Sequence, residues 1–146
     1  MATSSSVKIV DIKVETYKMT NHFSKINNID EANVQVVVDT TFSDVSEEEK
    51  DFVKLDLALD INIITPDNEI LTALQMNQIS IFTHDSKDMN VEEFINDFGL
   101  NMISISYPYA RSFVSSVTAL AGITPIELPA INVIDLVTNG ENKKKS

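Results

Sequence analysis

Apolar and polar residues alternate along four stretches of the chain, and a period of two is typical of β-strands that bury one face. The clearest stretch sets six apolar residues, from Val53 to Ile63, on one face and mainly charged or amide side chains on the other. Short connections between consecutive strands predict antiparallel neighbours, so the four strands are expected in one sheet. The predicted strands are Val7 to Thr16, Val34 to Phe42, Phe52 to Ile64 and Ile70 to Phe82.

Downstream of the strands, apolar residues recur every three or four positions, which indicates an amphipathic helix. The apolar stripe is expected to face the core and keeps its phase through Pro108, so the helix is predicted from Asn101 to about Ala121 with the proline inside it. The alternative is that Pro108 is the first helical position. Gly122 can adopt a left-handed C-terminal cap, and Pro125 prevents the helix from resuming. The stripe consists of Met102, Ile105, Tyr109, Phe113, Val117 and Leu120.

Shorter elements are predicted on both sides of this helix. Asn90 can begin a helical segment through a capping box, and Gly99 is expected to break that segment before the long helix. The stretch from Ile123 to Ile131 contains two prolines and little periodicity, so it is expected to be extended. Asn132 can cap a short last helix that ends near Asn139.

The predicted fold is α+β: a four-stranded antiparallel sheet with two helices, one long and one short, packed on one face. The 146 residues are expected to form a single domain, with residues 1–6 and 140–146 as disordered tails. One sheet face and the long helix cannot bury all of the apolar residues in the sequence. The residues alone leave open whether they form ordinary core with an oligomer interface, or an open groove for non-native chains.

Charge and composition narrow the function classes. A net charge of −11 argues against nucleic-acid binding, which depends on Lys and Arg side chains that neutralise phosphates. The absence of cysteine excludes a disulfide framework and a thiolate metal site. No apolar run approaches the roughly 18 residues of a membrane span, and residues 1–6 do not resemble a signal peptide. We therefore expect a cytoplasmic protein that does not insert into membranes.

The sequence offers no catalytic constellation. His22 and His84 lie in separate polar connections without a second ligand nearby, so both are expected at the surface and not on a metal. The acidic run from Asp85 to Asp97 lacks the ligand spacing and central glycine of a calcium loop. Three glycines are too few for a phosphate-binding loop. We therefore expect a protein that is not an enzyme and needs no metal or cofactor.

Two linked motifs carry a family resemblance. The segment Tyr107-Pro108-Tyr109-Ala110-Arg111 is followed by Gly122-Ile123-Thr124-Pro125-Ile126-Glu127-Leu128-Pro129-Ala130-Ile131-Asn132. Together they resemble the signature of the SecB family of export chaperones, in which a Phe-Pro-Tyr-Ala-Arg-Glu segment precedes a Gly-x-x-Pro-x-x-x-Leu-x-Pro-x-Asn-like connection. The resemblance is sharp from Asn101 to Asn132 and elsewhere is one of layout.

This resemblance implies a homotetramer, built as a dimer of dimers, that holds unfolded or preprotein clients in hydrophobic grooves without ATP. Clients would be covered by apolar side chains, and their extended backbone could add to the sheet. We expect the connection residues of the groove to be exposed, so that replacing Ile126 and Leu128 with serine would leave the fold intact. By this resemblance the groove is lined by Ile123, Ile126, Leu128, Ile131, Val133, Leu136 and Val137.

Departures from the family pattern affect the expected partners. Tyr107 replaces the usual Phe, and Ser112 replaces the usual Glu. Gln75 stands where export members carry an acidic residue that docks the SecA motor, so this docking contact is expected to be weak or absent. The short last helix also suits a solitary SecB-like chaperone of a toxin-antitoxin pair. The alternative in another class is an oligomeric interaction module of the same fold that binds no client.

Overall fold

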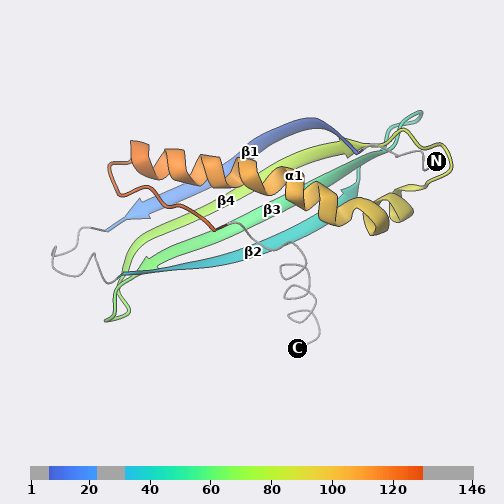
Figure 1. Ribbon diagram of the computed structural model, residues 1–146. Helices are drawn as coiled ribbons and strands as arrows, with labels where there is room; N and C mark the ends of the chain where they lie inside the picture. Colours follow the sequence, from blue (N-terminus) through green and yellow to red (C-terminus); the bar gives the residue numbers. More distant parts are fainter. Residues whose placement is uncertain (1–6, 23–31, 130–146) are drawn as a thin grey trace.

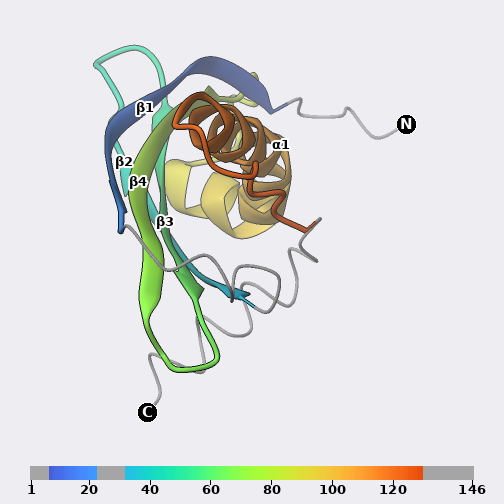
Figure 2. The same cartoon turned by 90° about the vertical axis from the view of Figure 1, so that its left-hand side faces the viewer.

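The computed structural model describes residues 7–22 and 32–129, which form one antiparallel sheet and one long helix (Figure 1). The strands are β1 (Lys8–Asn21), β2 (Asn33–Asp44), β3 (Phe52–Ile64) and β4 (Ile70–Thr83), and the helix is α1 (Val91–Leu120). The strand order is β1-β4-β3-β2. All of α1 lies on one face of the sheet (Figure 2), so the described part has the predicted α+β layers. Two helices were predicted on this face, but the described residues contain only α1, and the predicted short last helix lies outside them.

Strand β1 pairs with β4 and not with β2, its neighbour in sequence. It is also longer than the predicted Val7 to Thr16. Its register against β4 shifts between Val14 and Thr16, which marks a β-bulge there. Before the bulge Val14 pairs with Gln78, and beyond it Tyr17 pairs with Met76. The strand therefore continues, but the residues that face α1 change from even-numbered to odd-numbered positions. This break in the period made the strand seem to end too early.

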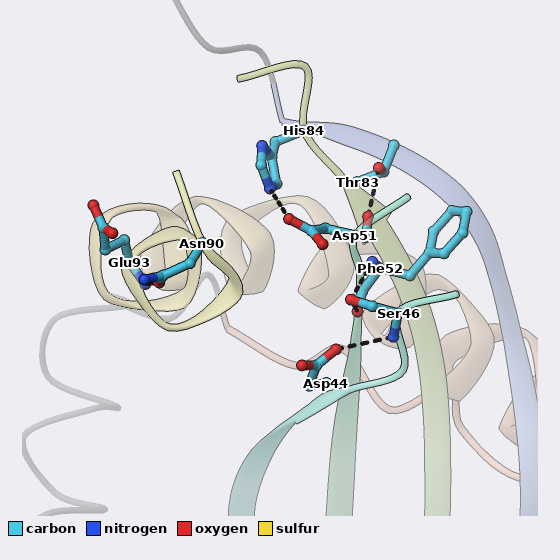
Figure 3. Close-up of polar contacts among 8 residues, drawn as sticks. All are labelled: Asp44, Ser46, Asp51, Phe52, Thr83, His84, Asn90 and Glu93. Carbon is cyan, nitrogen blue, oxygen red and sulfur yellow. Dashed lines mark hydrogen bonds and ion pairs between the residues drawn. The ribbon is translucent and has the colours of Figure 1, made fainter. Parts of the chain in front are cut away.

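The other three strands form two hairpins, and the register between β3 and β4 shifts only between Ile63 and Ile64, at the end of β3. β3 has the predicted bounds, and its inward residues from Val53 to Ile61 are buried. The β3–β4 turn places Asn68 at a positive φ of 64°, a conformation that asparagine tolerates. In the β2–β3 connection, Ser46 accepts a hydrogen bond from the Phe52 N–H and donates its own N–H to Asp44 Oδ1 (Figure 3).

Helix α1 begins ten residues earlier than predicted and runs through Gly99 without a break. Asn90 is its N-cap, because its Oδ1 accepts the Glu93 N–H at 2.8 Å (Figure 3). Gly99 is buried against the ring of Phe42: an added Cβ would lie 3.3 Å from the ring. This glycine therefore lets the helix approach β2 closely, and it does not end a segment.

The C-terminal end of α1 is as predicted. Ala121 is the C-cap, and Gly122 adopts a φ of 84°. The Gly122 N–H binds the Ala119 carbonyl, and the Ile123 N–H binds the Thr118 carbonyl at 3.2 Å. This pair of bonds is a Schellman motif, which satisfies carbonyls that the helix leaves open and turns the chain back along it.

The buried face of α1 differs from the predicted stripe. Tyr109 is 53% exposed and Leu120 is 87% exposed, whereas Val114 is fully buried. At about 100° per residue, the buried face is rotated by roughly 80° from the predicted stripe. The apolar pattern was misleading because the buried face includes small and polar residues. It consists of Phe94, Gly99, Met102, Ile103, Ser106, Tyr107, Ala110, Val114 and Thr118.

Polar residues in this interface are paired across the helix and sheet. The Ser106 hydroxyl donates to Ser80 Oγ at 2.9 Å, and Gln78 donates to the Ser106 carbonyl at 2.9 Å.

His84 is also buried, contrary to the surface position predicted for it. The centroid of its ring lies 4.5 Å from the centroid of the Phe94 ring, and its Nε2 lies 3.2 Å from Asp51 Oδ2 (Figure 3). His84 is buried because β4 ends directly beneath the first turn of α1.

The observed orientation of α1 leads to a first testable prediction. Replacing Val114 with Asp should unfold the protein, because an unpaired charge in the core costs several kcal/mol of a total stability of about 5–15 kcal/mol. Replacing Tyr109 with Asp should leave the fold intact, although Tyr109 belongs to the predicted stripe. Urea denaturation followed by circular dichroism compares the two variants. Equal loss of folding in both would contradict this helix orientation.

Candidate functional site

After α1 the chain returns along the helix as an extended segment, residues 123–129, which we call the strap (Figure 1). Ile126 and Leu128 point inward and are 4% and 2% exposed, while Glu127 between them is exposed. They belong to a core cluster with Leu57, Leu59, Ile61, Leu74, Met76, Tyr107, Ala110 and Val114. Half-buried Val36 and Val38 of β2 pack against the same cluster. The strap therefore joins α1 to the β2 side of the sheet.

Three side chains of α1 hold the strap backbone. The Thr118 hydroxyl accepts the Ile126 N–H at 2.9 Å, and Arg111 Nε donates to the Leu128 carbonyl at 2.9 Å. The Tyr107 hydroxyl donates to the Pro129 carbonyl at 2.8 Å. Burial raises the pKa of the Tyr107 hydroxyl, and the charge of Arg111 opposes this shift more weakly. Each such hydrogen bond typically contributes about 1 kcal/mol, so the strap is a fixed part of the fold.

The motif that carries the family resemblance is thus explained by packing. Tyr107 and Arg111 bind strap carbonyls, and Ala110 is fully buried between them. Pro108 lies inside the helix, as predicted. Tyr109 points away from the core and is half-exposed. None of these contacts requires the carboxylate that Ser112 replaces.

The predicted groove residues fall into three groups. Ile126 and Leu128 lie in the core, which does not fit the expectation that they line an open groove. The sequence pattern of the strap could not distinguish groove residues from core residues, because an extended apolar segment can also cover a core. Ile123 is half-buried and faces a surface hollow. Four others, Ile131, Val133, Leu136 and Val137, lie outside the described residues.

The hollow at Ile123 is the best candidate for an apolar binding site. It has a volume of about 290 Å³ and lies where α1 ends over the tips of β1, β3 and β4. No residue that lines it is acidic or basic except His22. Thr72 donates a hydrogen bond to Asn21 Oδ1 at 2.8 Å, which fixes one wall. The lining residues are Asn21, His22, Ile63, Leu71, Thr72, Gly122, Ile123 and Thr124.

Among residues 7–22 and 32–129, β2 is an edge strand with no partner on its outer side, and it lies beside this hollow. Val34 is 50% exposed and pairs with Ile63 of the hollow. β2 has an unbroken register against β3 and contains no Lys, Arg or Pro. The opposite edge strand, β1, carries two register shifts and three lysines, features that protect an edge from further pairing. Sequence reasoning missed this contrast because it did not assign the edges of the sheet.

Two other hollows are lined in part by charged residues. One, of about 420 Å³, lies on the sheet face away from α1, where Gln75 is exposed and pairs with Lys18 and Asp60. Another, of about 540 Å³, lies between α1 and the strap and is lined in part by Arg111, Ser112 and Glu127. It occupies the position where the family carries the carboxylate that Ser112 replaces.

Across residues 7–22 and 32–129, no three His, Asp or Glu side chains gather where they could hold a metal ion. No helix in the same ranges has both the length and the hydropathy to span a bilayer.

Comparison with known proteins addresses the fold. No family model matches the chain. The SecB-like chaperone Rv1957 of Mycobacterium tuberculosis, solved with a ChAD peptide from the Rv1956 HigA1 antitoxin, superposes with a TM-score of 0.70 at 14% identity. The match covers 86% of this chain and 91% of Rv1957. The fold is SecB-like.

Two further similarities add less. A Streptococcus agalactiae protein of unknown function aligns over 87% of this chain and 99% of its own, with a TM-score of 0.39 and 14% identity. The uncharacterized protein MJ0357 of Methanocaldococcus jannaschii is 41% identical over 46 residues, which are 32% of this chain. That match spans only 30% of the relative's length. The SecB-like fold therefore rests on the Rv1957 superposition.

The buried strap of this SecB-like fold makes a second prediction. Replacing Ile126 and Leu128 with serine should abolish folding, because each loss of a buried aliphatic side chain typically costs about 2–5 kcal/mol. Replacing Tyr107 with Phe removes only one hydrogen bond and should lower the free energy of unfolding by about 1 kcal/mol. Chemical denaturation monitored by tyrosine fluorescence and circular dichroism measures both. A folded double serine variant would show that the strap does not belong to the core.

Proposed function

We propose that this protein is an ATP-independent holdase that binds extended segments of unfolded polypeptides. The observation that carries the proposal is an apolar hollow next to a strand edge that has no partner among the described residues of this SecB-like fold. A neighbour of the same fold, Rv1957, was solved with a bound peptide, which supports peptide binding as the use of such a surface.

In this proposal the hollow and the β2 edge act together. An apolar client side chain enters the hollow against Ile63 and Ile123, and the neighbouring client backbone pairs with the N–H and C=O groups of β2. Because the backbone supplies the hydrogen bonds, binding requires little sequence specificity. Apolar burial contributes about 25 cal/mol per Å², and no nucleotide takes part.

Charge favours a particular class of client. The chain carries 22 acidic and 11 basic residues, and β2 contains Asp39 and Asp44 but no basic residue. An extended segment that alternates apolar residues with lysine or arginine matches both faces of this edge. We propose such segments, of preproteins or of an antitoxin, as clients in the cytoplasm.

Self-association is part of the proposal. Tyr17 is 54% exposed and packs edge-on against Phe113 at 5.1 Å, which links β1 to the outward side of α1. Tyr109 and Leu120 extend this exposed apolar surface along the helix. Burying it between copies would give the homotetramer, a dimer of dimers, and would leave β2 free for clients.

The partners differ in the support they have. Gln75 lacks the charge that would dock the SecA motor, although Asp60 lies beside it in the register. The antitoxin peptide bound to Rv1957 supports a toxin-antitoxin pair more directly. We therefore propose the solitary chaperone role first and the export role second.

The exposed surface of α1 also favours a second candidate function. An oligomeric interaction module would bury Tyr109, Phe113 and Leu120 between copies and bind no client. The two candidates make different predictions for the hollow, because only the holdase requires it to stay open in the oligomer.

The third prediction concerns mass and client holding. Light scattering should give a mass near four chains, and the mass should increase when a chemically unfolded, slowly refolding protein is added. The same protein should aggregate more slowly in its presence, without nucleotide. An oligomer that leaves both the mass and the aggregation rate of the client unchanged would favour the interaction module.

The fourth prediction concerns the hollow. Replacing both Ile63 and Ile123 with Ser should weaken binding of a fluorescein-labelled peptide of alternating leucine and lysine by about tenfold or more, because two apolar contacts are lost. Fluorescence anisotropy measures the Kd. The matched control replaces Gln75 with Ala, on the opposite sheet face, and should leave the Kd unchanged. Equal Kd values for both variants would move the binding site elsewhere.

A further inference from the structure

Thr118 holds the strap at two points. Its backbone carbonyl accepts the Ile123 N–H at 3.2 Å, and its hydroxyl accepts the Ile126 N–H at 2.9 Å. The two bonds enclose Thr124 and Pro125 in a short loop whose ends are fixed on one residue. Ile123 and Thr124, on this loop, line the hollow.

The hydroxyl of Thr118 has a defined orientation. It lies 2.7 Å from the Val114 carbonyl and 3.1 Å from the Ser115 carbonyl, and both oxygens can only accept. Its one proton therefore goes to the helix, and a lone pair is left for the Ile126 N–H. Thr118 is fully buried, so water cannot replace this bond. Without the hydroxyl, the strap would have no side-chain acceptor for the Ile126 N–H at this position.

The other strap bonds act on a different part of the segment. Arg111 and Tyr107 hold the carbonyls of Leu128 and Pro129, and neither of these residues lines the hollow at Ile123. The effect of Thr118 on this hollow is therefore separable from the general attachment of the strap.

We infer that Thr118 is a positioning residue for client binding, which sets the wall of the hollow by fixing both ends of the loop from Ile123 to Ile126. This inference rests on the proposed holdase function. Thr118 does not touch the client. Its backbone carbonyl, which any residue would supply, holds the Ile123 end of the loop, and its hydroxyl holds the Ile126 end. Without the hydroxyl, the loop that carries Ile123 and Thr124 would be fixed at one end only, and its wall of the hollow would lose a defined position.

Two substitutions separate the hydroxyl from the packing of Thr118. Thr118→Val keeps the volume and removes the hydroxyl, whereas Thr118→Ser keeps the hydroxyl and removes a buried methyl group. If Thr118 is a positioning residue, Thr118→Val should weaken binding of the leucine–lysine peptide by about tenfold and Thr118→Ser by less than about twofold. Tyr107→Phe, which removes a strap bond away from the hollow, should also stay within about twofold of the wild type.

The measurement is the peptide Kd by fluorescence anisotropy, at a temperature well below the melting point of every variant. Melting temperatures are recorded in parallel. The inference is overturned if Thr118→Val binds like the wild type, or if affinity follows melting temperature and Thr118→Ser loses as much as Thr118→Val. In either case, a loss of affinity in the double Ile63 and Ile123 variant would leave the proposed function standing. Failure of the wild type itself to bind the peptide would overturn both.

Discussion

A single helix cannot cover one face of a four-stranded sheet, and the rest of this structure depends on that constraint. A helix with its side chains is about 10 Å wide, whereas the outer backbones of four strands lie about 14 Å apart. Helix α1 packs mainly on β3 and β4. The strap supplies cover on the side of β2 through Ile126 and Leu128. Among the described residues, neither covers the outer edge of β2, where Val34 is 50% exposed, and the proposed client surface includes this edge.

The helix can cover the central strands well because its buried face is flat. Gly99 and Ala110 bring the backbone close to the sheet, and Ser106 meets Ser80 directly. Larger residues at these positions would lift α1 and leave the hydroxyl and amide groups of β4 without partners. The buried face also holds large side chains such as Phe94 and Met102, whereas Tyr109, Phe113 and Leu120 lie outside it. The surface available for assembly follows from the fit of the core.

The sequence predicted the parts of the fold whose signal is local. The alternation of β3, the N-cap at Asn90 and the left-handed Gly122 each depend on neighbouring residues, and each was found as predicted. The orientation of α1 could not be predicted this way, because hydropathy places Tyr109 inside and Thr118 outside. Thr118 can be a core residue because its hydroxyl donates to the Val114 carbonyl of the same helix and accepts the Ile126 N–H of the strap. The candidate site was predicted only in part. Ile123 was identified from the sequence, but the position of Ile63 beside it depends on the strand order, which is a tertiary feature.

The contacts of Tyr107 and Arg111 determine what a sequence match in their motif can say about structure and about client binding. Tyr107 and Arg111 bind backbone carbonyls of the strap, which any residue could supply. A match in this motif therefore indicates that the chain folds back along α1 in the same way. Among the residues proposed to contact a client, Ile123 lies within the linked motifs, whereas Val34, Ile63 and Leu71 lie in the sheet, far from the motifs in sequence, so the match carries no information on those three. These positions can diverge without disturbing the strap, so a common fold leaves the choice of client open to change.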